Sequence, residues 1–345
     1  MEKKSGVLMI DALSREPLSI ADSIKIQGVT SCLAAPLLVE DQKVLGLLYL
    51  DVRLGRKSFT PDDLRLASLI ANTAAIKLEN LRLQEGAAAR AQMEREMSLA
   101  FEVQRRLLPE KAPTLVNTSL RGHNVPSRRV SGDYYDFFSR RDGTWDAVVA
   151  DVCGKGMAAS ILAASVQAAY HAWADENLPP DRLCERLNDF VYKRTSPEKF
   201  VTFIVAHYDP ESGSLLYTNA GHNPGVLLRA NGTYEELGAH GTPLGLLPNR
   251  SYGSGVYTMR PGDLLVLYTD GVTEASDPDD AEFGLERLVA TVSAVRTRPL
   301  EEIEKVLGDT LVEFARGTPF ADDRTVVLLR REAEAVATLT VTVLT

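Results

Sequence analysis

The pattern of hydrophobic and polar positions changes along this chain and divides it into regions. Residues 31–39 and 43–51 are apolar-rich runs of strand length, separated by a polar turn, and they predict a β-hairpin. Thr60 followed by Pro61 is typical of a helix start, and apolar residues then recur at a mostly helical spacing. Residues 1–84 are therefore expected to form a small α+β region.

The next segment, 77–108, contains no proline and consists mostly of strong helix formers. It predicts one long helix that ends at Pro109. An apolar stripe on this helix fits either a partner chain or the chain's own following domain. The stripe consists of Met93, Met97, Ala100, Val103 and Leu107. On the first alternative, residues 85–109 are a helical linker through which the chain forms a homodimer.

Residues 110–332 show short β-like runs interrupted by helical patterns. The strand candidates are 144–151, 200–206, 214–219, 225–229, 264–269 and 325–330. The helix candidates are 157–175, 181–193, 282–296 and 299–316. Strands and helices in separate runs favour a layered α+β domain over regular βαβ alternation. Residues 333–345 form a tail without an assigned role.

Composition narrows the class of protein. The chain has 345 residues, of which 45% are hydrophobic and 25% charged, as in a soluble globular protein of two domains. Its apolar stretches are far shorter than a membrane span. The net charge of −9 argues against nucleic acid as a partner. Cys32, Cys153 and Cys184 form no Cys-x-x-Cys pair, so a disulfide framework is not expected. The protein is therefore expected in the reducing cytoplasm.

Four acidic sites stand out in the second region because each lies at a strand end or a tight turn. They are Asp133 with Asp136, Asp151 with the following Val152, Asp270-Gly271, and Asp322-Asp323 directly before a strand. Mg²⁺ and Mn²⁺ prefer oxygen ligands, and two such ions can share and acidify a water. A single Asp-Gly pair is more often a plain turn. The prediction of a metal site therefore depends on all four sites occurring in one domain.

Six phrases give this region a resemblance to a known family. SGDYYD, ADVCGKGMAAS, TNAGHNP, YTDGVTEA and ADDRTVVLL, with EREMSLAFEVQRRLLP upstream, resemble the PPM-type phosphatases, in the bacterial branch typified by the stage II sporulation E protein. The resemblance covers residues 94–332 and implies a β-sandwich flanked by helices. It also implies two divalent ions, Mn²⁺ or Mg²⁺, and hydrolysis of phosphoserine or phosphothreonine by metal-activated water. The implied partner is a phosphorylated STAS-type anti-sigma-factor antagonist.

The resemblance also implies a role for each main site residue. Asp151 would bridge both ions, and Val152 would offer its backbone carbonyl. Asp133 would complete the shell of one ion, while Asp270 and Asp322 would hold the other. Asp151 and Asp270 are therefore the catalytic candidates.

The remaining candidates have supporting or open assignments. Arg129 corresponds to a phosphate-contacting arginine of eukaryotic relatives, and a plain surface arginine is the alternative. Asp136 and Asp323 are expected to support or cap the ligands. His222 is expected to be structural, because no suitable metal-ligand partner is near it in the sequence. The segment 154–156 lacks the spacing of a nucleotide-binding phosphate loop.

Residues 1–84 resemble the second half of a GAF sensor domain, through APLLVEDQKVLGLLYLD and FTPDDLRLASLIANTAAIKLEN. The first strands and the first helix of such a domain have no counterpart, so a partial GAF-like region is expected. A small α+β dimerisation region is the alternative. For the whole chain, the rival hypotheses are a pseudo-phosphatase that binds without hydrolysis and a phosphotransferase of another fold. Retention of the aspartates argues against the first, and the absence of a convincing nucleotide-binding signature argues against the second.

Overall fold

The computed structural model describes residues 6–10, 29–39, 43–53, 57–106, 108–109, 111–127, 131–196 and 198–333. The chain forms two compact units, Met1–Arg95 and Glu96–Thr345. Within the described part of the chain, none of the helices has the length and apolar character needed to cross a membrane.

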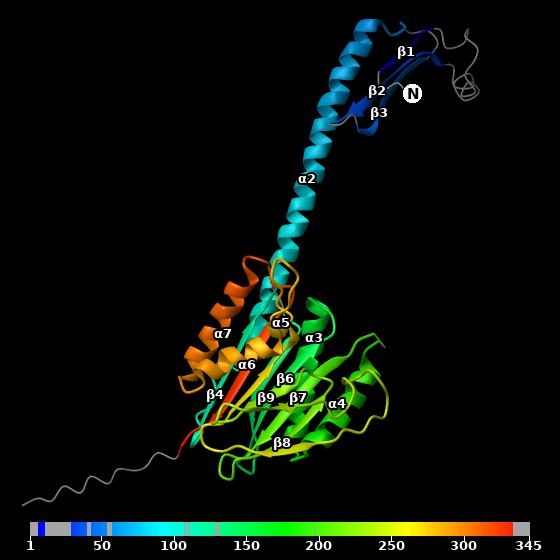
Figure 1. Cartoon of the computed structure of the whole chain (residues 1–345). Helices are drawn as coiled ribbons and strands as arrows, with labels where there is room; N and C mark the ends of the chain where they lie inside the picture. The colour runs from blue at the N-terminus through cyan, green and yellow to red at the C-terminus, as the bar shows by residue number, and fades with distance from the viewer. Residues whose placement is uncertain are drawn as a thin grey trace, which may run out of the picture. The chain divides into compact units, whose positions relative to one another are not determined.

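The first unit is a three-stranded antiparallel sheet packed against a helix (Figure 1). Its strands lie in the order β1-β2-β3, and their bounds are β1 Val7–Ile10, β2 Val29–Leu38 and β3 Val44–Arg53. The predicted hairpin is thus confirmed as β2 and β3. Helix α2, Pro61–Arg105, covers one face of this sheet, where Ala67 and Ala71 pack against Leu33 and Ala35. Small side chains on the helix allow this close packing.

Helix α2 begins where the sequence predicts. The Thr60 hydroxyl accepts a hydrogen bond from the backbone N–H of Asp63 at 3.3 Å, and the Asp63 carboxylate accepts one from the Thr60 N–H at 2.7 Å. This reciprocal pair satisfies backbone donors that the first helical turn leaves free. Along the predicted apolar stripe, Met93 is exposed. The other side chains of that stripe lie outside the described ones.

The second unit is a β-sandwich of two five-stranded antiparallel sheets (Figure 1), as the resemblance implied. One sheet has the order β10-β9-β12-β13-β4 and the other β11-β8-β7-β6-β5. The bounds of these strands are β4 Thr118–Val125, β5 Asp133–Ser139, β6 Trp145–Val152, β7 Val201–Tyr208, β8 Ser214–Ala220, β9 Gly225–Leu228, β10 Tyr234–Leu237, β11 Gly255–Thr258, β12 Leu264–Tyr268 and β13 Arg324–Arg331.

Helices cover both outer faces of the sandwich. Their bounds are α3 Met157–Ala174, α4 Pro180–Arg194, α5 Asp270–Thr273, α6 Gly284–Val295 and α7 Leu300–Ala315. Side chains of β6 alternate between two cores: Val148 packs under α3 and α4, whereas Val149 packs against the other sheet. Because β6 is buried on both faces, it reads in the sequence as a continuous apolar run.

Candidate metal centre

The first two predicted ligands lie on neighbouring strands. Asp133 begins β5 and Asp151 lies near the end of β6, and the antiparallel register pairs them directly with each other. Directly opposed residues in an antiparallel pair project to the same face of the sheet. Sheet pairing therefore brings together two carboxylates that are far apart in the sequence.

The other two predicted ligands meet at the edge of the second sheet. Asp270 follows β12, and Asp322 precedes β13. These strands are antiparallel neighbours, so the end of one lies beside the start of the other. A Cβ atom on Gly271 would lie 2.0 Å from the carbonyl oxygen of Asp323. Only glycine permits this close approach of the two backbones, which brings the segments of Asp270 and Asp322 together.

Two threonines join the edges of the two sheets through Asp133. One oxygen of the Asp133 carboxylate accepts hydrogen bonds from the hydroxyl of Thr269 at 2.8 Å and that of Thr325 at 2.6 Å. Thr269 follows β12 and Thr325 belongs to β13, so these bonds cross the sandwich. They fix the orientation of a carboxylate that is almost completely buried. Neither threonine stands out in the sequence as a candidate site residue.

Asp323 holds the segment that leads into β5. Its carboxylate accepts hydrogen bonds from the hydroxyl of Ser131 and the backbone N–H of Gly132, both at 2.8 Å. It also accepts one from the backbone N–H of Ser127 at 2.7 Å. Asp323 is thus placed to position the backbone immediately before Asp133, which suits the supporting role expected for it.

The electrostatics of this cluster favour a cation. Burial raises the pKa of Asp133, and the neighbouring charge of Asp151 raises it further. The pKa of Asp151 rises to about 7, through burial and then the charges of Asp270 and Asp322. Burial and the charge of Asp322 also raise the pKa of Asp270. Buried carboxylates that repel one another gain from a cation placed between them.

The candidate ligands do not surround a single point in the metal-free chain. Among the described residues, no three acidic, histidine or cysteine side chains already converge as a metal site. Asp322 instead pairs with the ammonium group of Lys155 at 2.8 Å, and this group also donates to the carbonyl of Ala321 at 2.7 Å. In the metal-free chain, Asp322 thus has a cationic partner in Lys155.

Comparison with known proteins places the chain in a family. Residues 141–332, more than half of the chain, match the family model of Stage II sporulation protein E (SpoIIE). The chain belongs to the SpoIIE family. Residues 4–78 match the GAF domain model. Both resemblances stated from the sequence motifs are thus confirmed.

Individual relatives agree with this assignment. Protein IcfG of Synechocystis sp. is 27% identical over 263 residues, which are 68% of this chain and 41% of IcfG. Phosphoserine phosphatase RsbU of Bacillus subtilis is 28% identical over 240 residues, 69% of this chain and 70% of RsbU. The chain thus spans less than half the length of IcfG and about 70% of that of RsbU. The solved SiaA-PP2C domain of Pseudomonas aeruginosa has a TM-score of 0.63 at 21% identity, covering 71% of this chain and 99% of that domain, which establishes a PP2C-like fold.

In this SpoIIE-family chain, Asp136 lies apart from the other acidic residues. It faces α3, where its carboxylate accepts a hydrogen bond from Tyr134 at 2.8 Å, contacts His171 at 2.5 Å and accepts one from Gln167 at 3.4 Å. Asp133 and Asp136 project to opposite faces because side chains alternate along β5. The contacts of Asp136 therefore tie the strand to the helix.

His222 links the two sheets of the SpoIIE-family domain. Its Nδ1 accepts a hydrogen bond from the Thr202 hydroxyl at 2.7 Å, and its Nε2–H donates to the Tyr268 carbonyl at 3.0 Å. Burial lowers the pKa of His222 to about 4, so the ring is neutral at pH 7. These contacts agree with the structural role expected from the sequence.

Two predicted residues remain to be placed. Val152 ends β6, and its carbonyl oxygen lies 3.2 Å from the position of a Cβ atom on Gly132, so it borders the segment before Asp133. Arg129 lies outside the described residues, and its contact with phosphate stays a prediction.

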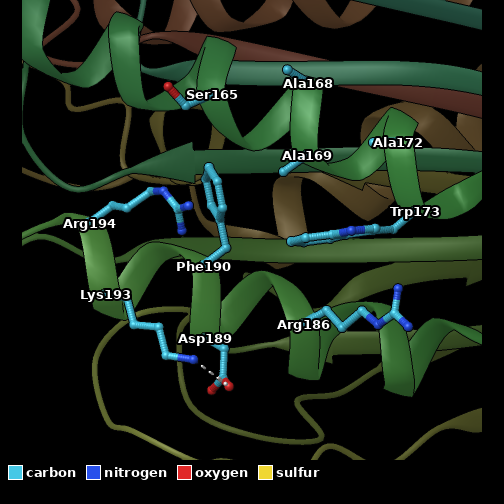
Figure 2. A pocket seen from close by; sticks show the side chains of 10 residues that line it. All are labelled: Ser165, Ala168, Ala169, Ala172, Trp173, Arg186, Asp189, Phe190, Lys193 and Arg194. Atoms are coloured by element: carbon cyan, nitrogen blue, oxygen red, sulfur yellow. Dashed lines mark hydrogen bonds and ion pairs between the residues drawn. The ribbon is translucent and has the colours of Figure 1, made fainter.

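A groove of about 700 Å³ lies between α3 and α4 of this SpoIIE-family domain (Figure 2). Its walls include Trp173 and Phe190, whose rings meet edge to face at 5.9 Å, and Arg194 lies over the Phe190 ring. None of the predicted metal ligands lines this groove. The candidate metal centre is therefore a separate feature of the domain.

Proposed function

We propose that this chain is a metal-dependent protein serine/threonine phosphatase of bacterial signalling, which hydrolyses phosphoserine or phosphothreonine with metal-activated water. The observation that carries the proposal is that Asp133, Asp151, Asp270 and Asp322 lie close enough to one another for burial and mutual repulsion to raise the pKa of three of them. RsbU, a relative over most of the chain, bears the name phosphoserine phosphatase.

The donor set suits hard divalent cations. Asp133, Asp151, Asp270 and Asp322 offer carboxylate oxygens, and Val152 offers its backbone carbonyl, which are the oxygen ligands that Mn²⁺ and Mg²⁺ prefer. Two such ions, when bound, would acidify a water and offset the negative charge of the phosphate. Asp151 and Asp270 are the catalytic candidates because they would contact these ions from both sheets.

The remaining residues of the site orient these donors. Thr269 and Thr325 hold one oxygen of Asp133, so the carboxylate needs little reorganisation before it binds. Asp323 fixes the backbone before Asp133. Lys155 pairs with Asp322 in the metal-free chain.

The proposed substrate is a phosphorylated STAS-type anti-sigma-factor antagonist in the cytoplasm. The resemblance of the motifs to the SpoIIE branch supports this class of partner, and the similarity to the phosphoserine phosphatase RsbU is consistent with a phosphoserine substrate. We place the GAF-like region, 1–84, upstream as a sensor that acts through the linker, 85–109, on the phosphatase domain, 110–332.

The test is hydrolysis of a phosphoserine peptide with and without Mn²⁺. Asp151→Asn and Asp270→Asn are expected to abolish Mn²⁺-dependent hydrolysis without unfolding the domain. Asp142→Asn is the matched control, because Asp142 is an exposed turn residue whose carboxylate accepts hydrogen bonds from the backbone N–H and hydroxyl of Thr144. A parent protein that binds Mn²⁺ but hydrolyses no phosphopeptide would instead indicate a pseudo-phosphatase.

A further inference from the structure

The groove between α3 and α4 is lined by small side chains of α3 and by two aromatic rings (Figure 2). Ala168 and Ala172 lie about one turn apart on α3 and are exposed to solvent. Alanines at this spacing let another helix approach α3 closely. The rings of Trp173 and Phe190 pack against the core on one side and line the groove on the other. The groove is therefore an open hollow with a largely apolar lining.

Helix α4 is held in place by the loop that follows β10. The buried Asn188 side chain accepts a hydrogen bond from the backbone N–H of Gly245 at 2.9 Å and donates one to the carbonyl of Leu247 at 3.1 Å. The hydroxyl of Tyr252 donates to the same Asn188 oxygen at 3.3 Å. The wall that α4 gives to the groove is thus fixed within the domain, which lowers the ordering cost of binding a partner there.

The side chains of the groove are of the kinds that dominate protein–protein interfaces. Trp173 and Phe190 supply the rings, and Arg186 and Arg194 supply two guanidinium groups. Aromatic residues and arginine are enriched at interfaces, and tryptophan and arginine are among the commonest hot spots. A single exposed apolar side chain is ordinary on a protein surface. The combination of rings and arginines in one hollow indicates a protein partner.

The charge of the groove is opposite in sign to that of the whole chain. The chain has a net charge of −9, whereas the groove is lined by Arg186, Lys193 and Arg194 and by one acidic residue, Asp189. Lys193 pairs with Asp189 at 3.4 Å, and Arg186 pairs with Glu176 at 2.6 Å. Exposed pairs of this kind contribute little stability, so both cations can exchange these partners for carboxylates of another protein.

Arg194 is the cation most available to a partner. Its guanidinium carbon lies 4.4 Å from the centre of the Phe190 ring, and no carboxylate pairs with it in the part of the chain that the structure describes. A guanidinium stacked on a ring keeps its N–H donors for a carboxylate. Charge complementarity therefore favours an acidic partner over a second copy of the same groove.

We propose that this groove docks an acidic amphipathic helix of the phosphoprotein substrate, at a distance from the metal centre that removes the phosphate. The inference rests on the proposed phosphatase function. The apolar face of the docked helix lies against Trp173 and Phe190, as in other helix-in-groove complexes. Carboxylates along its edge pair with Lys193 and Arg194.

The groove is within reach of a substrate domain bound at the metal centre. Helix α3 begins at Met157, directly after the 154–156 segment that follows β6 and its candidate ligand Asp151. At 1.5 Å per residue, Ser165 and Trp173 lie about 12 and 24 Å along the helix from Met157. A small domain is about 30 Å across. One folded substrate can therefore contact the groove while its phosphoserine lies at the metal centre.

The first test is binding without hydrolysis. Purified phosphorylated STAS-domain proteins of the same organism are titrated by calorimetry into the full chain in EDTA. We expect the parent to bind one of them, and Ala168→Glu and Arg194→Glu each to weaken this binding by at least about tenfold, since both place a carboxylate where the partner is acidic. Ala290→Glu is the matched control, because Ala290 is an exposed alanine inside α6, a helix that covers the other sheet. No binding by the parent, or parent-like binding by both groove variants, would overturn the proposal.

The second test separates docking from chemistry by hydrolysis in Mn²⁺. Arg194→Glu should raise KM for the phosphoprotein by at least about tenfold and leave kcat and the hydrolysis of a short phosphoserine peptide unchanged. Arg194→Lys keeps the charge and should retain more affinity than Arg194→Glu. An equal loss of peptide hydrolysis in Arg194→Glu would assign the groove to support of the metal centre and would reject docking.

The two tests also distinguish failure of this inference from failure of the phosphatase function. A parent that binds the phosphoprotein through the groove and hydrolyses nothing would contradict the phosphatase function and support the docking site. A parent that hydrolyses the phosphoprotein with the same KM as Ala168→Glu and Arg194→Glu would support the phosphatase function and contradict the docking site.

Discussion

Gly271→Ala is expected to separate the two halves of the metal centre without unfolding the domain. The added Cβ atom would lie 2.0 Å from the Asp323 carbonyl oxygen and 3.2 Å from the Asp322 carbonyl carbon. Carbon atoms in proteins reach their optimal separation at about 3.5–4.0 Å. Real Cβ atoms essentially never approach another heavy atom within 3.0 Å, so the backbone at Asp270 must move away from the 322–323 segment by at least about 1 Å.

This shift is large for a metal site. Ligand distances in such sites hold to within about 0.2 Å, and a misplacement of about 1 Å can cost on the order of 100-fold in rate. We expect Mn²⁺-dependent hydrolysis to fall by about 100-fold. The free energy of unfolding should fall by only about 1–3 kcal/mol, the usual cost of overpacking.

The assay combines phosphopeptide hydrolysis, Mn²⁺ titration by calorimetry and thermal unfolding. Gly308→Ala in α7 is the matched control, because a Cβ atom there meets nothing within 4 Å. It should leave hydrolysis unchanged and stabilise the helix by up to about 1 kcal/mol. Parent-like Mn²⁺ affinity and hydrolysis in Gly271→Ala would refute the idea that this close approach assembles the site.

Three further predictions follow from the same site. Thr325→Val removes one donor to Asp133, and we expect calorimetry to show about 10–100-fold weaker Mn²⁺ binding. The raised pKa of Asp151 (about 7 in the metal-free chain) makes the folded state bind more protons than the unfolded state between about pH 4 and 7. The free energy of unfolding of EDTA-treated protein should therefore fall as pH rises through this window, and added Mn²⁺ should restore it. A free energy of unfolding that rises with pH over the same window would contradict this. Cys153→Ala should keep most hydrolysis, because its thiol donates only a long hydrogen bond of 3.7 Å to the Glu198 carbonyl and has no role in the proposed reaction. Loss of hydrolysis in a variant that still binds metal would contradict this.

Much of the fold could be predicted from the sequence because its signals are local. Apolar runs predicted β6 and β12, and the Thr60-Pro61 pair predicted the start of α2. Strand β4 was missed because it carries polar side chains: Arg121 pairs with Glu304 of α7, and Asn124 donates a hydrogen bond to Thr325. Such side chains identify a strand only once their partners on other elements are known.

Strand β5 was missed for a different reason, so the sequence could not show which way Asp136 points. Its first residues, Asp133 to Asp136, resemble a motif in a loop more than an alternating strand. Once β5 is known to be a strand, alternation places Asp133 and Asp136 on opposite faces. Asp133 then lies on the face of the other candidate ligands, whereas Asp136, which was expected only to support or cap them, lies on the face towards α3.

The sequence by itself identified which carboxylates to consider, since each lies at a strand end or a tight turn within a motif that resembles the PPM-type phosphatases. It could not show that Asp133 pairs in register with Asp151, or that Gly271 brings Asp270 beside Asp322. Nor could it identify the hydroxyls of Thr269 and Thr325 as partners of Asp133. Periodicity and capping depend on residues close together in the chain. The approach of these groups depends instead on strand register and sheet packing, which join Thr269 and Thr325 to Asp133 across separations of 136 and 192 residues and which tertiary structure alone decides.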